Sequence, residues 1–186
     1  MKWFLALVSI AIAGSPAVNP PVGPVQRKLD VLRDGKAKPG SVFVFTSAEL
    51  NAWVRAKAPQ VVPEGLRQPR LELGNGTATG YALVDFLKLR HAAGIETNWL
   101  IAKLIQGEKR VKASATVRSS NRTATVHVTR VEIGGLGVSG ATLDFLTKTF
   151  FFPLYPNAKI DEPFDLADRV DRIEVTPAEA RAYVKK

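Results

Sequence analysis

The stretch VKASATVRSSNRTATVHVTRVEI (residues 111–133) decides the fold, because its side chains alternate as those of a two-stranded antiparallel hairpin do. Every second residue from Val111 to Val117 is apolar, and after the polar turn SSNR the alternation resumes from Ala124 to Val128. Residues 131–133 then fall on the opposite parity, which predicts a bulge near Thr129-Arg130. We therefore expect a long, bent hairpin with one apolar face.

Further strand signals lie on both sides of this hairpin. Residues 41–45 (SVFVF) are rich in β-formers, and Arg172–Val175 has the composition of a strand. Asn75-Gly76, the dipeptide most typical of a tight hairpin turn, separates Leu71–Leu73 from Thr77–Phe86. The chain thus supplies several antiparallel strands, and we expect no internal repeat.

Helix signals are shorter. A short helix is expected over Val25–Arg33. Thr46 and Glu49 have the spacing of a capping box, which predicts a helix from there through Ala56, closed by Pro59 and Pro63. A last short helix is expected to open at Thr176–Glu179, where the same spacing occurs.

Two apolar segments lie between these elements. Trp99–Leu104 suggests a short helix, ended by Gly107. Leu143–Tyr155 (LDFLTKTFFFPLY) predicts a helix that Ser139 or Gly140 can cap and Pro153 stops. A helix that is apolar nearly all round either lies in the core or lines an apolar cavity, and the sequence leaves both open.

The N-terminus predicts export. Lys2, an apolar run over residues 3–13 and the small residues before the cleavage point have the pattern of a signal peptide. We expect a signal peptide over residues 1–13, a proline-rich linker and short helix over 14–40, and a single α+β domain over 41–186. The mature protein is then periplasmic or extracellular; the alternative is an uncleaved N-terminal membrane anchor.

Composition narrows the chemistry. The chain has no cysteine. Its net charge of +9 favours anionic lipid head groups, lipopolysaccharide or cell-wall polymers over nucleic acid, but the basic residues are scattered, which gives little support to a specific polyanion site. Gly135–Gly140 matches a dinucleotide fingerprint, but it follows the second arm of an antiparallel hairpin, so a flexible loop is favoured. The two histidines, His91 and His127, are isolated in sequence and predict no metal site and no catalytic base. We expect no cofactor and no catalytic residue.

The order of elements resembles that of small exported bacterial proteins related to the TULIP (tubular lipid-binding) superfamily. The resemblance runs from about residue 42 to 176. It is carried by Glu49-Leu50-Asn51 with Trp53-Val54, by residues 133–135 (IGG), and by Pro163–Leu166 leading to Arg172–Val175. It implies a highly curved antiparallel sheet wrapped around a long apolar helix, with short flanking helices and an apolar groove for an acyl chain. The family supplies no catalytic residues.

The expected groove has two parts. The residues expected to line it are hydrophobic: Leu50, Trp53, Val54, Trp99, Leu100, Leu143, Leu146, Phe150 and Phe151. Three basic residues, Lys88, Arg90 and Lys103, could hold a phosphate head group at its mouth.

Three functions stay open. The leading one is a non-enzymatic binder or carrier of a lipid or another hydrophobic molecule. The second is an envelope interaction or assembly protein with a solid core and no ligand. The third is an envelope hydrolase that would use His127 or the acidic residues between positions 161 and 171, although a solvated loop explains that cluster better. The acidic residues are Asp161, Glu162, Asp165, Asp168 and Asp171.

Overall fold

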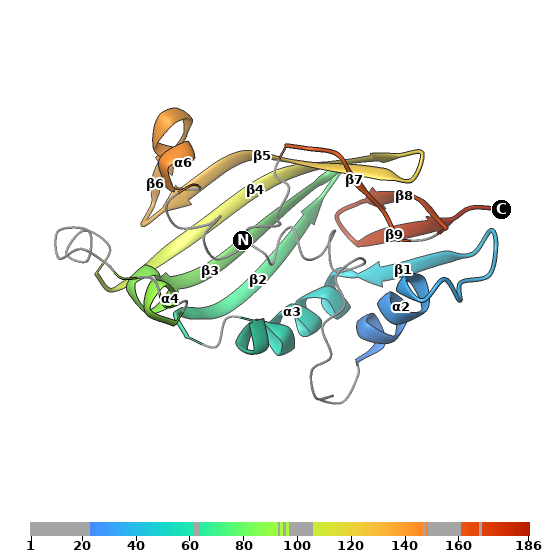
Figure 1. Ribbon diagram of the computed structural model, residues 1–186, viewed down its shortest axis with the longest axis horizontal. Coiled ribbons are helices and arrows are strands. Elements are labelled where there is room, and N and C mark those ends of the chain that lie inside the picture. Colours follow the sequence, from blue (N-terminus) through green and yellow to red (C-terminus); the bar gives the residue numbers. More distant parts are fainter. Residues whose placement is uncertain are drawn as a thin grey trace.

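The computed structural model describes residues 23–61, 64–92, 94, 96, 106–146, 148, 161–167 and 169–186. These residues form an α+β domain with two antiparallel sheets (Figure 1). The larger sheet has the order β2 (Leu66–Gly74), β3 (Thr77–Asp85), β4 (Glu108–Ser120), β5 (Thr123–Ile133) and β6 (Leu136–Val138), with β7 (Phe164–Asp165) also paired to β5. The smaller sheet has the order β1 (Val42–Thr46), β9 (Glu179–Val184) and β8 (Val170–Val175).

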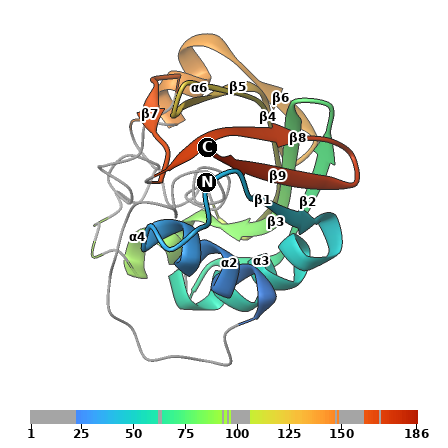
Figure 2. The same ribbon diagram turned by 90° about the vertical axis from the view of Figure 1, so that its right-hand side faces the viewer.

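Four helices accompany the sheets in the described part of the chain: α2 (Pro24–Arg33), α3 (Ser47–Val61), α4 (Phe86–Ala92) and α6 (Gly140–Leu146). Figure 2 shows that α2 and α3 lie together on one side, while the two sheets curve around the other sides of the interior. The helix expected over Val25–Arg33 is confirmed, with Pro24 at its first turn.

The bent hairpin is confirmed as β4 and β5. Its turn is Asn121-Arg122, and both residues have positive φ, as the tight hairpin turn that matches the strand twist requires. Ser114 pairs with Arg130 while Ala115 pairs with Val128, so Thr129 is the extra residue of the predicted bulge. Because of the extra residue, the apolar side chains before and after the bulge face the interior although their positions in the sequence have opposite parity.

The capping box at the start of α3 is also confirmed. The Thr46 N–H donates to Glu49 Oε2 (3.0 Å), and the Glu49 N–H donates to Thr46 Oγ1 (3.2 Å). The helix continues to Val61 with Pro59 inside it, so the predicted end near Ala56 was wrong. Pro59 lies on the exposed side next to the buried Ala58, and packing of this turn against the protein outweighs the missing backbone hydrogen bond.

Helix α3 protects the open edge of the larger sheet. Asn51 Nδ2 donates to the Leu71 carbonyl (2.8 Å), and the Leu71 N–H donates to Asn51 Oδ1 (2.8 Å). The side chain thus satisfies the two outward backbone groups of an edge-strand residue as another strand would.

The short helix expected near the C-terminal end differs from the structure. Residues 176–179 form the turn of a hairpin, in which the Thr176 N–H donates to the Glu179 carbonyl (2.9 Å), and β9 follows as the central strand of its sheet. The predicted last helix was therefore wrong, because Ala180, Ala182 and Val184 alternate toward the interior with a period of two.

The long apolar helix expected over Leu143–Tyr155 is not shown. Helix α6 covers Gly140–Leu146, and most of the remaining segment lies outside the described residues. The expected helix at Trp99–Leu104 lies outside them too.

Two hairpins of the structure, β2–β3 and β8–β9, share one local arrangement. The hairpins β2–β3 and β8–β9 have the same register and the same outward trio, an Arg, a Glu two positions later and a Tyr nine positions after the Glu. In each, the Arg guanidinium lies over the Tyr ring (4.3 and 4.0 Å) and the Tyr hydroxyl donates to the Glu (2.6 and 2.7 Å). The trios are Arg70, Glu72 and Tyr81, and Arg172, Glu174 and Tyr183.

Candidate functional site

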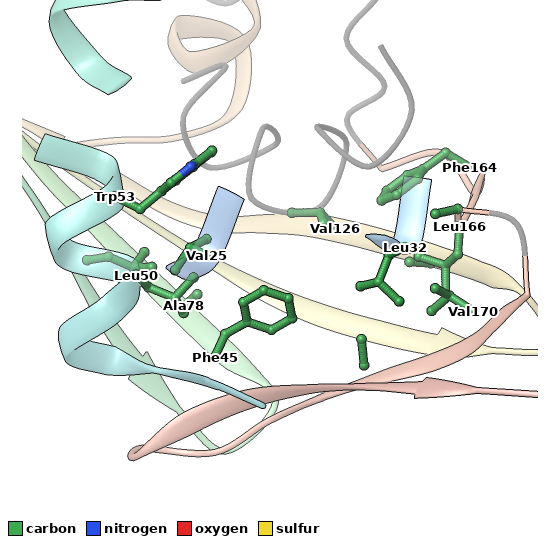
Figure 3. Close-up of a cluster of buried hydrophobic side chains, with 14 of the residues drawn as sticks. Val25, Leu32, Phe45, Leu50, Trp53, Ala78, Val126, Phe164, Leu166 and Val170 are labelled. Atoms are coloured by element: carbon green, nitrogen blue, oxygen red, sulfur yellow. The ribbon is translucent and has the colours of Figure 1, made fainter. Parts of the chain in front are cut away.

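An apolar cavity of about 80 Å³ lies between the two sheets and α2. Its walls come from α2, α3, β1–β4, β8, β9 and the segment after β7. Figure 3 shows Phe45 and Leu32 reaching into this interior from β1 and α2. The lining residues are Val25, Leu29, Leu32, Phe45, Leu50, Leu71, Leu73, Ala78, Val117, Leu166, Ala167, Val170, Ile173, Val175, Ala180, Arg181 and Ala182.

The lining offers almost no polar group. Arg181 is the single charged member of the set, and its guanidinium forms an ion pair with Glu179 (2.5 Å) at the surface. A cavity of this kind cannot hold a water molecule with two to four hydrogen bonds, so it either stays dry or accepts an apolar group.

The two hairpins line this cavity with residues at equivalent positions. Between the outward residues of each trio, the side chains at the alternate positions point inward. Leu71, Leu73 and Ala78 from the first hairpin correspond to Ile173, Val175 and Ala180 from the second. The tips of the hairpins meet where the Gly76 N–H donates to the Val175 carbonyl (2.9 Å).

A second cavity of about 80 Å³ continues along the inner face of the larger sheet. Three residues with small side chains, Gly80, Ala82 and Ala113, leave space above this part of the sheet. Val54 of α3 also lines the cavity. Leu71 lines both cavities, so its side chain separates the two spaces. We call the second cavity and the sheet face beyond it the inner groove.

The structure places the expected lining residues differently. Leu50 lines the first cavity and Val54 lines the second. Trp53 is buried between α2 and α3, where its Nε1 donates to Gln26 Oε1 (3.2 Å), and it lines neither cavity. Leu143 is half-buried on α6 and also lines neither.

Of the three expected head-group residues, the structure describes Lys88 and Arg90. Lys88 is exposed on α4. Arg90, on the same helix, is 7 % exposed and donates through Nη2 to the Glu96 carbonyl (2.8 Å), which is a structural contact at the end of the helix. The side chains of the remaining expected residues lie outside the described part: Trp99, Leu100, Lys103, Leu146, Phe150 and Phe151.

Sequence reasoning missed the contribution of α2 and of the second hairpin. Val25, Leu29 and Leu32 recur at the helical spacing that marks one apolar face, which is the signal that could have placed them in the site. The alternation in β9 was the corresponding signal for the second hairpin. Phe45 stood in the predicted strand SVFVF, but nothing in that strand indicated what it faces.

His127 and Asp161, both named in the hydrolase alternative, are hydrogen-bonded to each other. His127 Nδ1 lies 2.5 Å from Asp161 Oδ1, and both side chains are more than half exposed. Within the described ranges, no three His, Asp or Glu side chains are grouped so that they could hold a metal ion. Gly134-Gly135 is the turn of the antiparallel β5–β6 hairpin, so the glycine fingerprint is a hairpin turn and not a parallel dinucleotide-binding unit.

No described helix has the length and apolar character needed to cross a membrane. No protein-family model, no curated protein and no solved structure shows a significant match to this chain.

Proposed function

We propose that the protein is a non-enzymatic binder or carrier of a lipid or another hydrophobic molecule in the cell envelope. The observation that supports this proposal is the apolar cavity lined by both hairpins, which Leu71 separates from the inner groove. Each space is bordered by one arginine, Arg181 at the first and Arg70 at the second, and each arginine forms an ion pair with a nearby glutamate. The rest of both linings is mostly apolar, which favours the transfer of hydrocarbon from water.

The size of the spaces suits a slender ligand. Each cavity has a volume of about 80 Å³, roughly half that of a cavity known to hold benzene, about 150 Å³. A single hydrocarbon chain fits such a shape better than a fused ring system does. Each buried methylene contributes about 0.8 kcal/mol, so a few carbons in each cavity yield measurable affinity.

The proposal includes the finer architecture expected from the sequence. In it, a signal peptide over residues 1–13 directs export, and the curved sheet wraps the apolar segment Leu143–Tyr155 as in TULIP-related proteins. Leu143, Leu146, Phe150 and Phe151 would then extend the apolar lining along the inner groove.

The test fills the first cavity. Ala78 is 8 % exposed and lines the cavity, so Ala78→Leu replaces its methyl group with an isobutyl group that occupies the space. Ala52→Leu makes the same chemical change on the exposed face of α3 and is the matched control.

Each protein is purified without detergent, checked by circular dichroism and analysed by mass spectrometry for co-purifying lipid. We expect lipid with the wild-type protein and Ala52→Leu, and at least fivefold less with a folded Ala78→Leu. A wild-type protein that carries no lipid and takes up no fluorescent hydrophobic probe would contradict the proposal and favour an interaction protein with a solid core.

A further inference from the structure

One apolar side chain stands out at the rim of the inner groove. Leu136 follows the Gly134-Gly135 turn at the start of β6 and is 75 % exposed. Among the described large hydrophobic residues, Val42 is the other one with high exposure, at 46 %, and it lies on β1 in the smaller sheet. A single exposed leucine is common on protein surfaces, so its meaning depends on the apolar row and the charges beside it.

Leu136 continues the apolar face of the groove. It pairs with Ile133 across β5–β6, and Ile133 pairs with Val111 across β4–β5. Residues directly opposite one another in a sheet project from the same face. An apolar row therefore runs from Val111, which lines the second cavity, to Leu136 at the rim.

Basic residues occur at the same end of the larger sheet as Leu136. Lys109 projects from the same face as Val111, and Arg110 projects from the opposite face. Gly134 N–H donates to the Arg110 carbonyl (2.7 Å), which places Arg110 beside the turn, and Lys109 is its neighbour on β4. Lys88 lies on α4, which begins one residue after the last pair of β3 with β4. None of these three cations forms an ion pair with a described carboxylate, whereas nearby Glu108 is paired with Arg67 (3.1 Å).

We propose that this rim, made of Leu136 with Lys88, Lys109 and Arg110, docks on an anionic lipid bilayer. The leucine enters the interfacial region while the three cations contact lipid phosphates. This inference rests on the proposed function, because docking at the rim would bring the end of the inner groove to the membrane from which the ligand is taken. One apolar anchor with a few cations gives weak, reversible binding, as a carrier requires.

The absence of cysteine allows a local test on the full chain. Leu136→Cys carries an environment-sensitive NBD dye, and Val42→Cys with the same dye is the matched control. Vesicles of phosphatidylcholine with phosphatidylglycerol are compared with vesicles of phosphatidylcholine alone. We expect a blue shift and a rise in emission at position 136 with the anionic vesicles, and no change at position 42.

The role of the cations is tested in the labelled Leu136→Cys protein. Lys109→Glu together with Arg110→Glu should weaken the apparent vesicle affinity by roughly tenfold or more, because each cation near an anionic surface contributes about fivefold. High salt should weaken binding of the parent protein in the same direction.

Several outcomes would overturn docking: an unchanged signal at position 136, an equal change at position 42, or a signal that grows with protein concentration without vesicles. The last result would identify a second copy of the chain as the occupant. Ala78→Leu tests the two proposals independently. The variant should lose its co-purified lipid, whereas the same change in the labelled Leu136→Cys protein should leave the dye response to anionic vesicles unchanged. If docking fails, the wild-type protein should still carry its lipid.

Discussion

Replacing Leu71 with alanine removes the side chain that separates the two apolar cavities. Leu71 is 4 % exposed and belongs to β2, where Asn51 holds its backbone. Because the backbone is held at this point, we expect the space to stay open rather than collapse. The variant should therefore contain one continuous cavity.

The cost follows from the groups removed. Three buried carbon atoms at about 0.8 kcal/mol each account for roughly 2.4 kcal/mol of lost transfer free energy. Cavity formation adds to this, and buried leucine-to-alanine changes span about 2.7–5.0 kcal/mol. Since space already exists on both sides of Leu71, we expect the free energy of unfolding to fall by about 3–5 kcal/mol.

The same change should create a site for benzene. The joined cavity would have at least twice the volume of either cavity of about 80 Å³, which reaches the size that accepts benzene, about 150 Å³. Benzene at about ten times its Kd would raise the free energy of unfolding of the variant by about 1.4 kcal/mol. Urea unfolding with and without benzene measures both effects.

Leu73→Ala is the matched control, because Leu73 lines the first cavity alone. It should lose stability without gaining the same benzene response. A loss below about 1 kcal/mol for Leu71→Ala, or no benzene-dependent stabilisation, would refute the reasoning that two cavities meet at this side chain.

Three further predictions concern the elements around the cavity. The Lys28 ammonium, and then the Thr46 N–H, hold the pKa of Glu49 below its usual value. The ionised Glu49 side chain therefore stabilises the folded protein above the unfolded-state pKa, and this stabilisation is lost as the pH falls through the folded-state pKa. Glu49→Gln should cost about 1 kcal/mol at neutral pH, and this difference should shrink in urea titrations at acid pH. Asn51→Ala should cost about 2–4 kcal/mol and speed hydrogen exchange at the Leu71 amide; continued protection there would contradict its role at the strand edge. Gly76→Ala should cost about 1 kcal/mol by calorimetry because φ is +61°, although a Cβ would meet no atom closer than 3.9 Å; a neutral effect would contradict the strain argument.

Local patterns in the sequence predicted much of the larger sheet correctly. The alternation and phase change over residues 111–133 predicted the β4–β5 hairpin and its bulge. Thr46 and Glu49 predicted the start of α3, and Asn75-Gly76 predicted the β2–β3 turn. Each of these signals is contained within a few residues, where backbone geometry and nearby hydrogen bonds decide the conformation.

The same kind of signal misled where tertiary contacts decided the outcome. The spacing of Thr176 and Glu179 is that of a helix cap, yet strand pairing on both sides of β9 makes this segment the turn before a central strand. Likewise Pro59 does not end α3, because the packing of the helix extends past it. Partners distant in sequence supplied the free energy in both cases.

The candidate site depended most on the tertiary structure. Leu50 and Val54 were predicted as lining residues, but they line two different cavities. The equivalence of the hairpins at Arg70 and Arg172 became visible once their registers were known, since the repeated residues are few and spread over a long sequence separation.

Alternating segments, the first turns and the helix caps could be read from the order of residues, because those properties depend on neighbours along the chain. That the hairpins containing Leu71 and Ile173 line one shared space became known from the folded structure. A cavity is the space that distant walls fail to fill, and a solid core and a hollow one use the same apolar residues.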